Sequence, residues 1–109
     1  MATDATSDPP AAPAPAVVPR TYEELGRELG ELEKQFPPPE KGDDIPDARW
    51  YEANASALYE QYLGEHVAIL NGAVVGHNWD ELQLRIDVAR KYNIHPYRAL
   101  VVYLFTIFG

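Results

Sequence analysis

The chain has 109 residues, ten prolines, no cysteine and a formal net charge of −8. This length allows one small domain, and the lack of cysteine excludes disulfides and thiolate metal sites as sources of stability. The acidic balance disfavours nucleic acid and anionic membranes, because both are bound through clustered Lys and Arg. A domain this small is marginally stable alone, so we expect a protein partner or a second copy of the chain to stabilise it.

Residues 1–20 are rich in Ala and Pro and predict a disordered tail. They lack the basic start and apolar run of a signal peptide. The apolar run from Ala99 to Phe108 is too short for a membrane span, which needs about 20 residues. We therefore expect a cytoplasmic protein that does not enter membranes.

Residues 21–36 predict an amphipathic helix that begins with a capping box, formed by Thr21 and Glu24, and ends at three prolines. Gly26 and Gly30 weaken this helix, so it needs a surface on which to dock. That surface belongs either to the rest of the chain or to another protein. The apolar seam consists of Tyr22 and four candidate partner-binding residues: Leu25, Leu29, Leu32 and Phe36.

Residues 37–46 predict a Pro-rich linker, and residues 47–109 predict a small α+β domain. A second helix is expected over residues 47–63, with Asp47 as its N-cap and Gly64 at its end. The expected apolar face of this helix consists of Tyr51, Ala55, Leu58 and Tyr62, with Trp50 and Tyr59 beside it.

Asn71-Gly72 separates two apolar runs and predicts a two-residue type I′ turn within a β-hairpin. A two-residue turn places Leu70 opposite Ala73, and the same register places His66 opposite His77. Alternation along the strands assigns side chains to two apolar faces, so we expect a sheet that is covered on both sides. The first face contains Val67, Ile69 and Val74, and the second contains Ala68, Leu70 and Val75.

The register predicts that His66 and His77 form a cross-strand pair with Cβ atoms about 5 Å apart. Two imidazoles this close are weak candidates for a divalent metal site, with Glu65, Asp80 or His95 as further ligands. Alternatively, they are two half-exposed histidines at the mouth of the hairpin. Protonation of both below about pH 6 would then loosen this end of the sheet.

Residues 78–92 fit both a strand and a helix, and a second capping box of Asn78 and Glu81 favours the helix. Arg90, Lys91 and Asn93 are typical of a helix end. One face of this helix carries Leu82 and Ile86. Two further apolar residues, Leu84 and Val88, fall on a second ridge outside the expected core and are candidate partner-binding residues.

The last strand begins near Ala99 and is apolar on both faces. We place it beside the first strand of the hairpin, which gives the strand order 2-1-3. The predicted fold class is therefore α+β, with a small ββαβ core of a hairpin, a helix and a third strand. One packed helix and a tethered amphipathic helix precede this core.

No catalytic motif is present, and Ser56 lies in the middle of a predicted helix with no base near it. We therefore expect a non-catalytic protein-interaction module without a cofactor. Self-association is expected through the closing strand or the Leu84/Val88 ridge. The alternative is a small metal- or ligand-binding regulator that uses His66 and His77.

The second half of the chain resembles a small prokaryotic family, domain of unknown function 5678. A helix that ends in Gly, a short hairpin, an acidic helix start and an apolar closing strand carry the resemblance. The matching residues are Gly64, Val67-Ala68-Ile69, Asn71-Gly72, Val74-Val75, Asp80-Glu81-Leu82 and Val101-Val102. The resemblance covers roughly residues 50–105 and implies the ββαβ core, but no activity and no catalytic residue.

Overall fold

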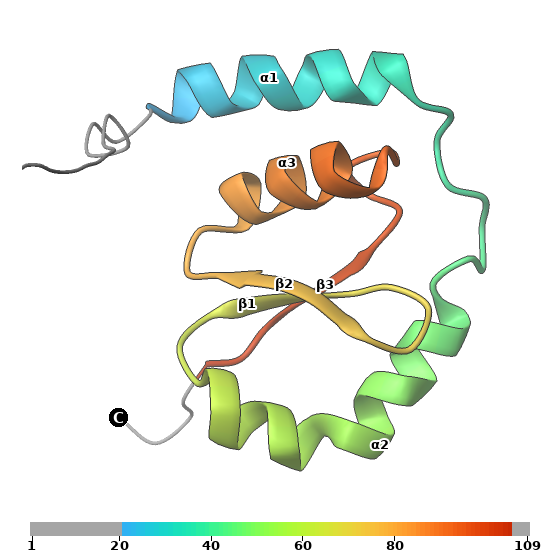
Figure 1. Cartoon of the computed structure of the whole chain (residues 1–109), viewed down its shortest axis with the longest axis vertical. Helices are drawn as coiled ribbons and strands as arrows, with labels where there is room; N and C mark the ends of the chain where they lie inside the picture. The colour runs from blue at the N-terminus through green and yellow to red at the C-terminus, as the bar shows by residue number, and fades with distance from the viewer. Residues whose placement is uncertain (1–20, 106–109) are drawn as a thin grey trace, which may run out of the picture.

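The molecule consists of four layers, in the order α1, α3, a β-sheet and α2 (Figure 1). The computed structural model describes residues 21–105. Its elements are α1 (Tyr22–Gln35), α2 (Ile45–Tyr62), β1 (His66–Ile69), β2 (Val74–Asn78), α3 (Glu81–Tyr92) and β3 (Leu100–Tyr103). This arrangement confirms the predicted α+β class and the ββαβ core. The tail expected over residues 1–20 lies outside the described residues.

The sheet has three antiparallel strands in the order β2-β1-β3, which confirms the predicted strand order. The pairing between β1 and β3 is regular from His66 opposite Tyr103 to Ile69 opposite Leu100. Helix α3 covers one face of the sheet and α2 covers the other (Figure 1). The sheet is thus covered on both sides, as its two apolar faces require.

The core between the sheet and α2 is built on Leu58 of α2, which is buried with Val67, Ile69 and Leu104. Aromatic residues of α2 complete this layer, and they are the ones expected from the sequence: Trp50, Tyr51, Tyr59 and Tyr62. Burial raises the pKa of the Tyr51 phenol, and its hydrogen bond with Tyr59 raises the pKa further. Both contributions favour the neutral phenol in the folded chain.

Helix α3 is the middle layer and is apolar on two sides. Leu84 and Val88 pack under the sheet with Ala68, while Ile86 and Ala89 pack against α1. Leu84 is only 2% exposed, so the prediction of an apolar ridge outside the core is wrong. A helix between two layers must be apolar on both sides, and this explains the second ridge.

Helix α1 docks on α3 of the same chain. Its predicted capping box is present, since Thr21 Oγ1 accepts a hydrogen bond from Glu24 N and Glu24 Oε1 accepts one from Thr21 N. An ion pair between Glu28 and Arg90 also joins α1 to α3. The docking face consists of the predicted residues Leu25, Leu29 and Leu32, with Phe36 partly buried beside them.

Both glycines of α1 are expected to tolerate a larger residue. A Cβ atom added to Gly26 or Gly30 meets no other atom within 4 Å. Alanine has the higher helix propensity, so each Gly→Ala substitution is expected to raise the free energy of unfolding by up to about 1 kcal/mol. Urea unfolding of the single and double variants measures this effect. A loss of stability in either single variant would contradict the packing of α1 described above.

Two helices begin at other residues than predicted. Helix α2 begins at Ile45 with Asp44 as its N-cap residue, so the linker is shorter than expected and Asp47 is not the cap. Helix α3 is capped by Asp80, whose Oδ1 accepts hydrogen bonds from the backbone N–H groups of the next turn, and not by Asn78. Its predicted end is confirmed by Asn93 in the left-handed conformation.

Asp47 lies in the first turn of α2 and holds the hairpin turn. Its side chain is 3% exposed, and its two carboxylate oxygens accept hydrogen bonds from Asn71 N at 3.2 Å and Gly72 N at 2.8 Å. Asn71 and Gly72 have φ angles of 54° and 73°, which confirms the predicted type of turn. One buried carboxylate therefore joins α2 to the β1–β2 turn, which lies 24 residues further along the chain.

The hairpin contains a β-bulge that the sequence analysis did not predict. Ile69 lies opposite Val74 as expected, but Ala68 lies opposite Gly76, so Val75 is the extra residue of β2. A Cβ atom on Gly76 would lie 3.1 Å from Leu84 and 3.2 Å from Val88. The bulge therefore places a glycine where side chains of α3 leave little room for a Cβ atom.

Candidate functional site: the open edge of the sheet

The structure does not bring together the histidines that were the candidates for a metal site. The bulge shifts the register, so His66 lies opposite Asn78 and His77 lies opposite Val67. Neighbouring residues of a strand point to opposite faces, and His66 and His77 therefore lie on different sides of the sheet. The predicted cross-strand pair is wrong, and the expected repulsion between the two charged imidazoles has no structural basis.

Each histidine has its own partners. His66 Nδ1 lies 3.1 Å from Trp79 O, and the His66 ring stacks on Tyr103 with 4.6 Å between the ring centroids. His77 Nδ1 lies 2.7 Å from Glu65 Oε1. Over residues 21–105 the structure contains no group of three or more His, Asp or Glu side chains that could hold a metal ion.

The open edge of β3 is the candidate site. Strand β3 pairs with β1 on one side, and no strand among the described residues pairs with its other side. Only alternate residues of an antiparallel strand bond to a given neighbour, so half of the N–H and C=O groups of β3 face this open edge. Such a row of backbone groups can bind the strand of another chain.

The composition of β3 favours such binding. Leu100, Val101, Val102 and Tyr103 carry no charge, and neither proline nor a bulge interrupts their pairing. Charged residues, prolines and bulges are the features by which natural edge strands avoid pairing with other chains. The other edge strand, β2, has one of them, because the bulge at Val75 disturbs its geometry.

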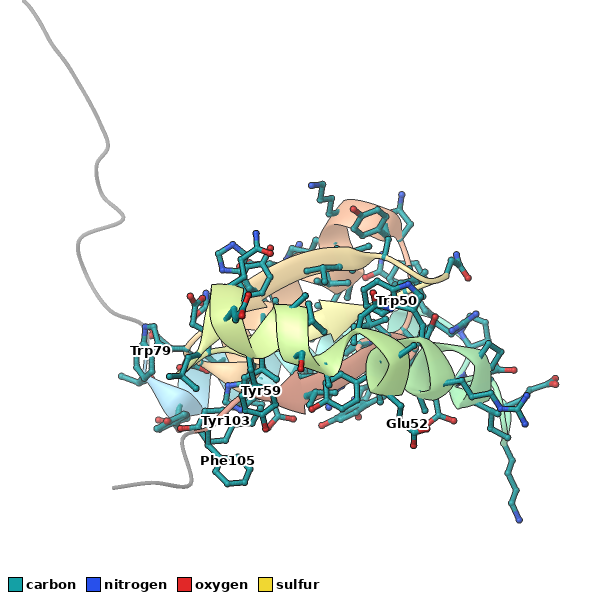
Figure 2. The ribbon with its side chains drawn as sticks, turned by 90° about the horizontal axis from the view of Figure 1, so that it is seen from below. Trp50, Glu52, Tyr59, Trp79, Tyr103 and Phe105 are labelled. Atoms are coloured by element: carbon teal, nitrogen blue, oxygen red, sulfur yellow. The ribbon has the colours of Figure 1, made fainter. Side chains whose placement is uncertain are left out.

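Two exposed aromatic residues mark the C-terminal end of β3. Tyr103 is 48% exposed and Phe105 is 45% exposed, and their rings stack with 5.7 Å between the centroids. Figure 2 shows both side chains projecting together away from the ribbon. Exposed aromatic residues beside an unpaired strand are typical of protein-interaction surfaces.

A cavity of about 540 Å³ lies at the N-terminal end of the same strand. Ala99, Leu100 and Val101 form one side of this cavity, and the chain between α1 and α2 forms another. Three cationic side chains (Lys41, Arg85 and Arg98) and three carboxylates (Glu40, Asp43 and Asp44) also line it. The cavity thus lies beside the first residues of β3 and next to Arg98.

Arg98 has a donor with no acceptor. Its Nη1 atom is buried and has no hydrogen-bond partner within the part of the chain that the structure describes. Arg85, in contrast, donates to Glu81 and to Pro96 O and lies over the Tyr97 ring at 4.3 Å. Arg85 thus has acceptors for its donors, whereas Arg98 keeps one buried donor that no acceptor meets.

The candidate partner-binding residues of the sequence analysis lie elsewhere. Those of α1 and α3 (Leu25, Leu29, Leu32, Leu84 and Val88) are buried in the chain's own core, and Phe36 is half-buried. The closing strand was expected to self-associate, but Tyr103, Phe105 and Arg98 were not singled out. The alternation of Val101, Tyr103 and Phe105 on one side of the strand was the available signal.

Comparison with known proteins gives no further guide to function. No family model, no curated protein and no solved structure matches the chain. The resemblance to domain of unknown function 5678 therefore stays a prediction. Among the described helices, none has the length and apolar character that crossing a membrane requires.

Proposed function

We propose that this chain is a non-catalytic protein-interaction module that self-associates through the open edge of β3. The uncharged and regular edge of this strand carries the proposal. Antiparallel pairing of β3 with β3 of a second copy, about a two-fold axis, joins the two sheets into one of six strands. The proposed setting is the cytoplasm, without a cofactor, nucleic acid or membrane.

A second copy is the proposed partner because the two ends of β3 differ and complement each other. Arg98, with its unpaired Nη1, lies at the N-terminal end, while the exposed rings of Tyr103 and Phe105 lie at the C-terminal end. Antiparallel pairing of two identical strands places the aromatic end of each beside the cationic end of the other. An arginine against an aromatic ring is a favourable contact, and no like charges meet along β3.

Replacement of Tyr103 by lysine is expected to prevent self-association. The side chain of Tyr103 is half-exposed, so the substitution leaves the buried core intact but places a charge on the pairing edge. Light scattering coupled to gel filtration measures the mass. We expect the wild-type chain to give about twice its monomer mass of 12.2 kDa, and the Tyr103→Lys variant to give the monomer mass.

The matched control is Tyr92→Lys. Tyr92 is also a partly exposed aromatic residue, 39% accessible, but it lies at the end of α3. The Tyr92→Lys variant is expected to keep the wild-type mass. A wild-type chain that remains a monomer at concentrations of about 100 μM, a hundredfold above a Kd of about 1 μM, would refute self-association.

A further inference from the structure

We infer that the cavity at the N-terminal end of β3 receives Phe105 and the residues after it from the second copy. This inference rests on the proposed function, and it names the segment of the partner that the site binds. The cavity lies against Ala99, Leu100 and Val101, so its position along β3 is fixed. A strand paired with this end of β3 passes the mouth of the cavity.

The direction of pairing selects the segment. In an antiparallel dimer of identical strands, the two-fold axis passes between one residue of the strand and the same residue of the partner strand. The middle residues of β3 are Val101 and Val102. An axis opposite Val101 places Phe105 beside the partner's Tyr97, and an axis opposite Val102 places it beside the partner's Ala99. With either axis, the chain after Tyr103 runs along the cavity of the other copy.

The chemistry of the segment suits the side of the cavity formed by the start of β3. Phe105 is exposed in the single chain and is followed in the sequence by Thr106-Ile107-Phe108, which lies outside the described residues and carries no charge. The side of the cavity formed by Ala99, Leu100 and Val101 is apolar. Burial of apolar side chains against it removes apolar surface from water and so favours the dimer.

Arg98 supplies the polar contact. Its buried Nη1 has no acceptor in the single chain, and an unmet donor of this kind is unfavourable. The backbone of an incoming strand carries C=O groups that need donors on its unpaired side. Because Nη1 is covered in the single chain, we infer that the Arg98 side chain turns toward the incoming strand and donates to one of these carbonyl groups, so that the dimer satisfies a donor that the monomer leaves unpaired.

A photo-crosslink tests which segment fills the cavity. A benzophenone side chain replaces Phe105 in the full-length protein, which is mixed with an equal amount of isotope-labelled chain that keeps Phe105. After irradiation, mass spectrometry is expected to find crosslinks between chains, to residues 39–44 or 97–101. Crosslinks found only within one chain, or between chains at other residues, would overturn the inference.

A charge variant gives an independent measurement. Ile107→Asp with Phe108→Asp places two charges in the segment and is expected to weaken dimerisation by at least about tenfold in Kd. The matched control, Gln35→Glu with Gln61→Glu, adds the same charge at exposed helical residues and is expected to leave Kd within about threefold.

The two proposals fail in different ways. A dimer that Tyr103→Lys abolishes but Ile107→Asp with Phe108→Asp leaves at wild-type strength would overturn the cavity inference and keep the proposed function. A wild-type chain that does not self-associate would remove both.

Discussion

Replacement of Asp47 by alanine is expected to lower the free energy of unfolding by about 2–3 kcal/mol. The carboxylate is buried and accepts one hydrogen bond on each oxygen, from Asn71 N and Gly72 N. Alanine leaves both N–H groups of the turn without this acceptor and also leaves a hole beside α2. Urea unfolding followed by circular dichroism measures the loss.

Two further variants show whether the lost stability comes from these two bonds. Asp47→Asn keeps one oxygen acceptor, so its loss is expected to be about half of that for alanine. Asp44→Ala removes an exposed carboxylate that makes no capping hydrogen bond and is expected to cost less than about 0.5 kcal/mol. Equal losses for Asp44→Ala and Asp47→Ala would contradict a specific contact with the turn.

Replacement of Ile86 by alanine is expected to lower the free energy of unfolding by about 3 kcal/mol. Ile86 is 1% exposed and lies in the apolar cluster that joins α3 to α1. The substitution removes buried methyl and methylene groups and leaves a cavity between two helices. The same urea experiment measures this effect.

A double-mutant cycle then tests whether α1 packs on α3 of its own chain in solution. Leu29 lies on α1 in the same cluster as Ile86, so the effects of Leu29→Ala and Ile86→Ala are expected to be coupled by at least about 0.5 kcal/mol. The cycle is carried out on the monomeric Tyr103→Lys background, where contacts between chains are absent. Additive effects there would mean that α1 does not dock on α3 within one chain.

The local features of the fold could be predicted from the sequence. Thr21 and Glu24 predict the start of α1, and Asn71-Gly72 predicts the hairpin turn. These signals depend on residues that are close in the chain, and their geometry follows from local hydrogen bonds and from φ. The assignment of Ile69 and Val74 to one sheet face also follows, because the pairing next to the turn is regular.

The bulge could not be predicted, because the run Val74-Val75-Gly76-His77 fits either register. Its position is favoured by α3, because a Cβ atom at residue 76 would lie only 3.1 Å from Leu84 and 3.2 Å from Val88. That contact joins elements separated by a turn and is not encoded in the alternation of apolar residues. The bulge places His66 and His77 on different faces of the sheet, so the predicted metal site between them does not form.

Asp47 and Leu84 were misread for a related reason. An aspartate near the start of a helix is typical of an N-cap. The carboxylate of Asp47 instead accepts hydrogen bonds from a turn 24 residues away. Leu84 belongs to a helix that is apolar on two sides, and the sequence does not indicate which layers lie there. The open edge of β3, in contrast, follows from the predicted strand order 2-1-3, which the structure confirms.

The middle position of α3 has a consequence for the order in which the chain opens. Helix α1 packs on the side of α3 that faces away from the sheet, so it can detach without disturbing the strands. Such a detachment is a partial unfolding step with its own free energy. Amide hydrogens of α1 are therefore expected to exchange with deuterium faster than those of β1, which is buried at the centre of the molecule.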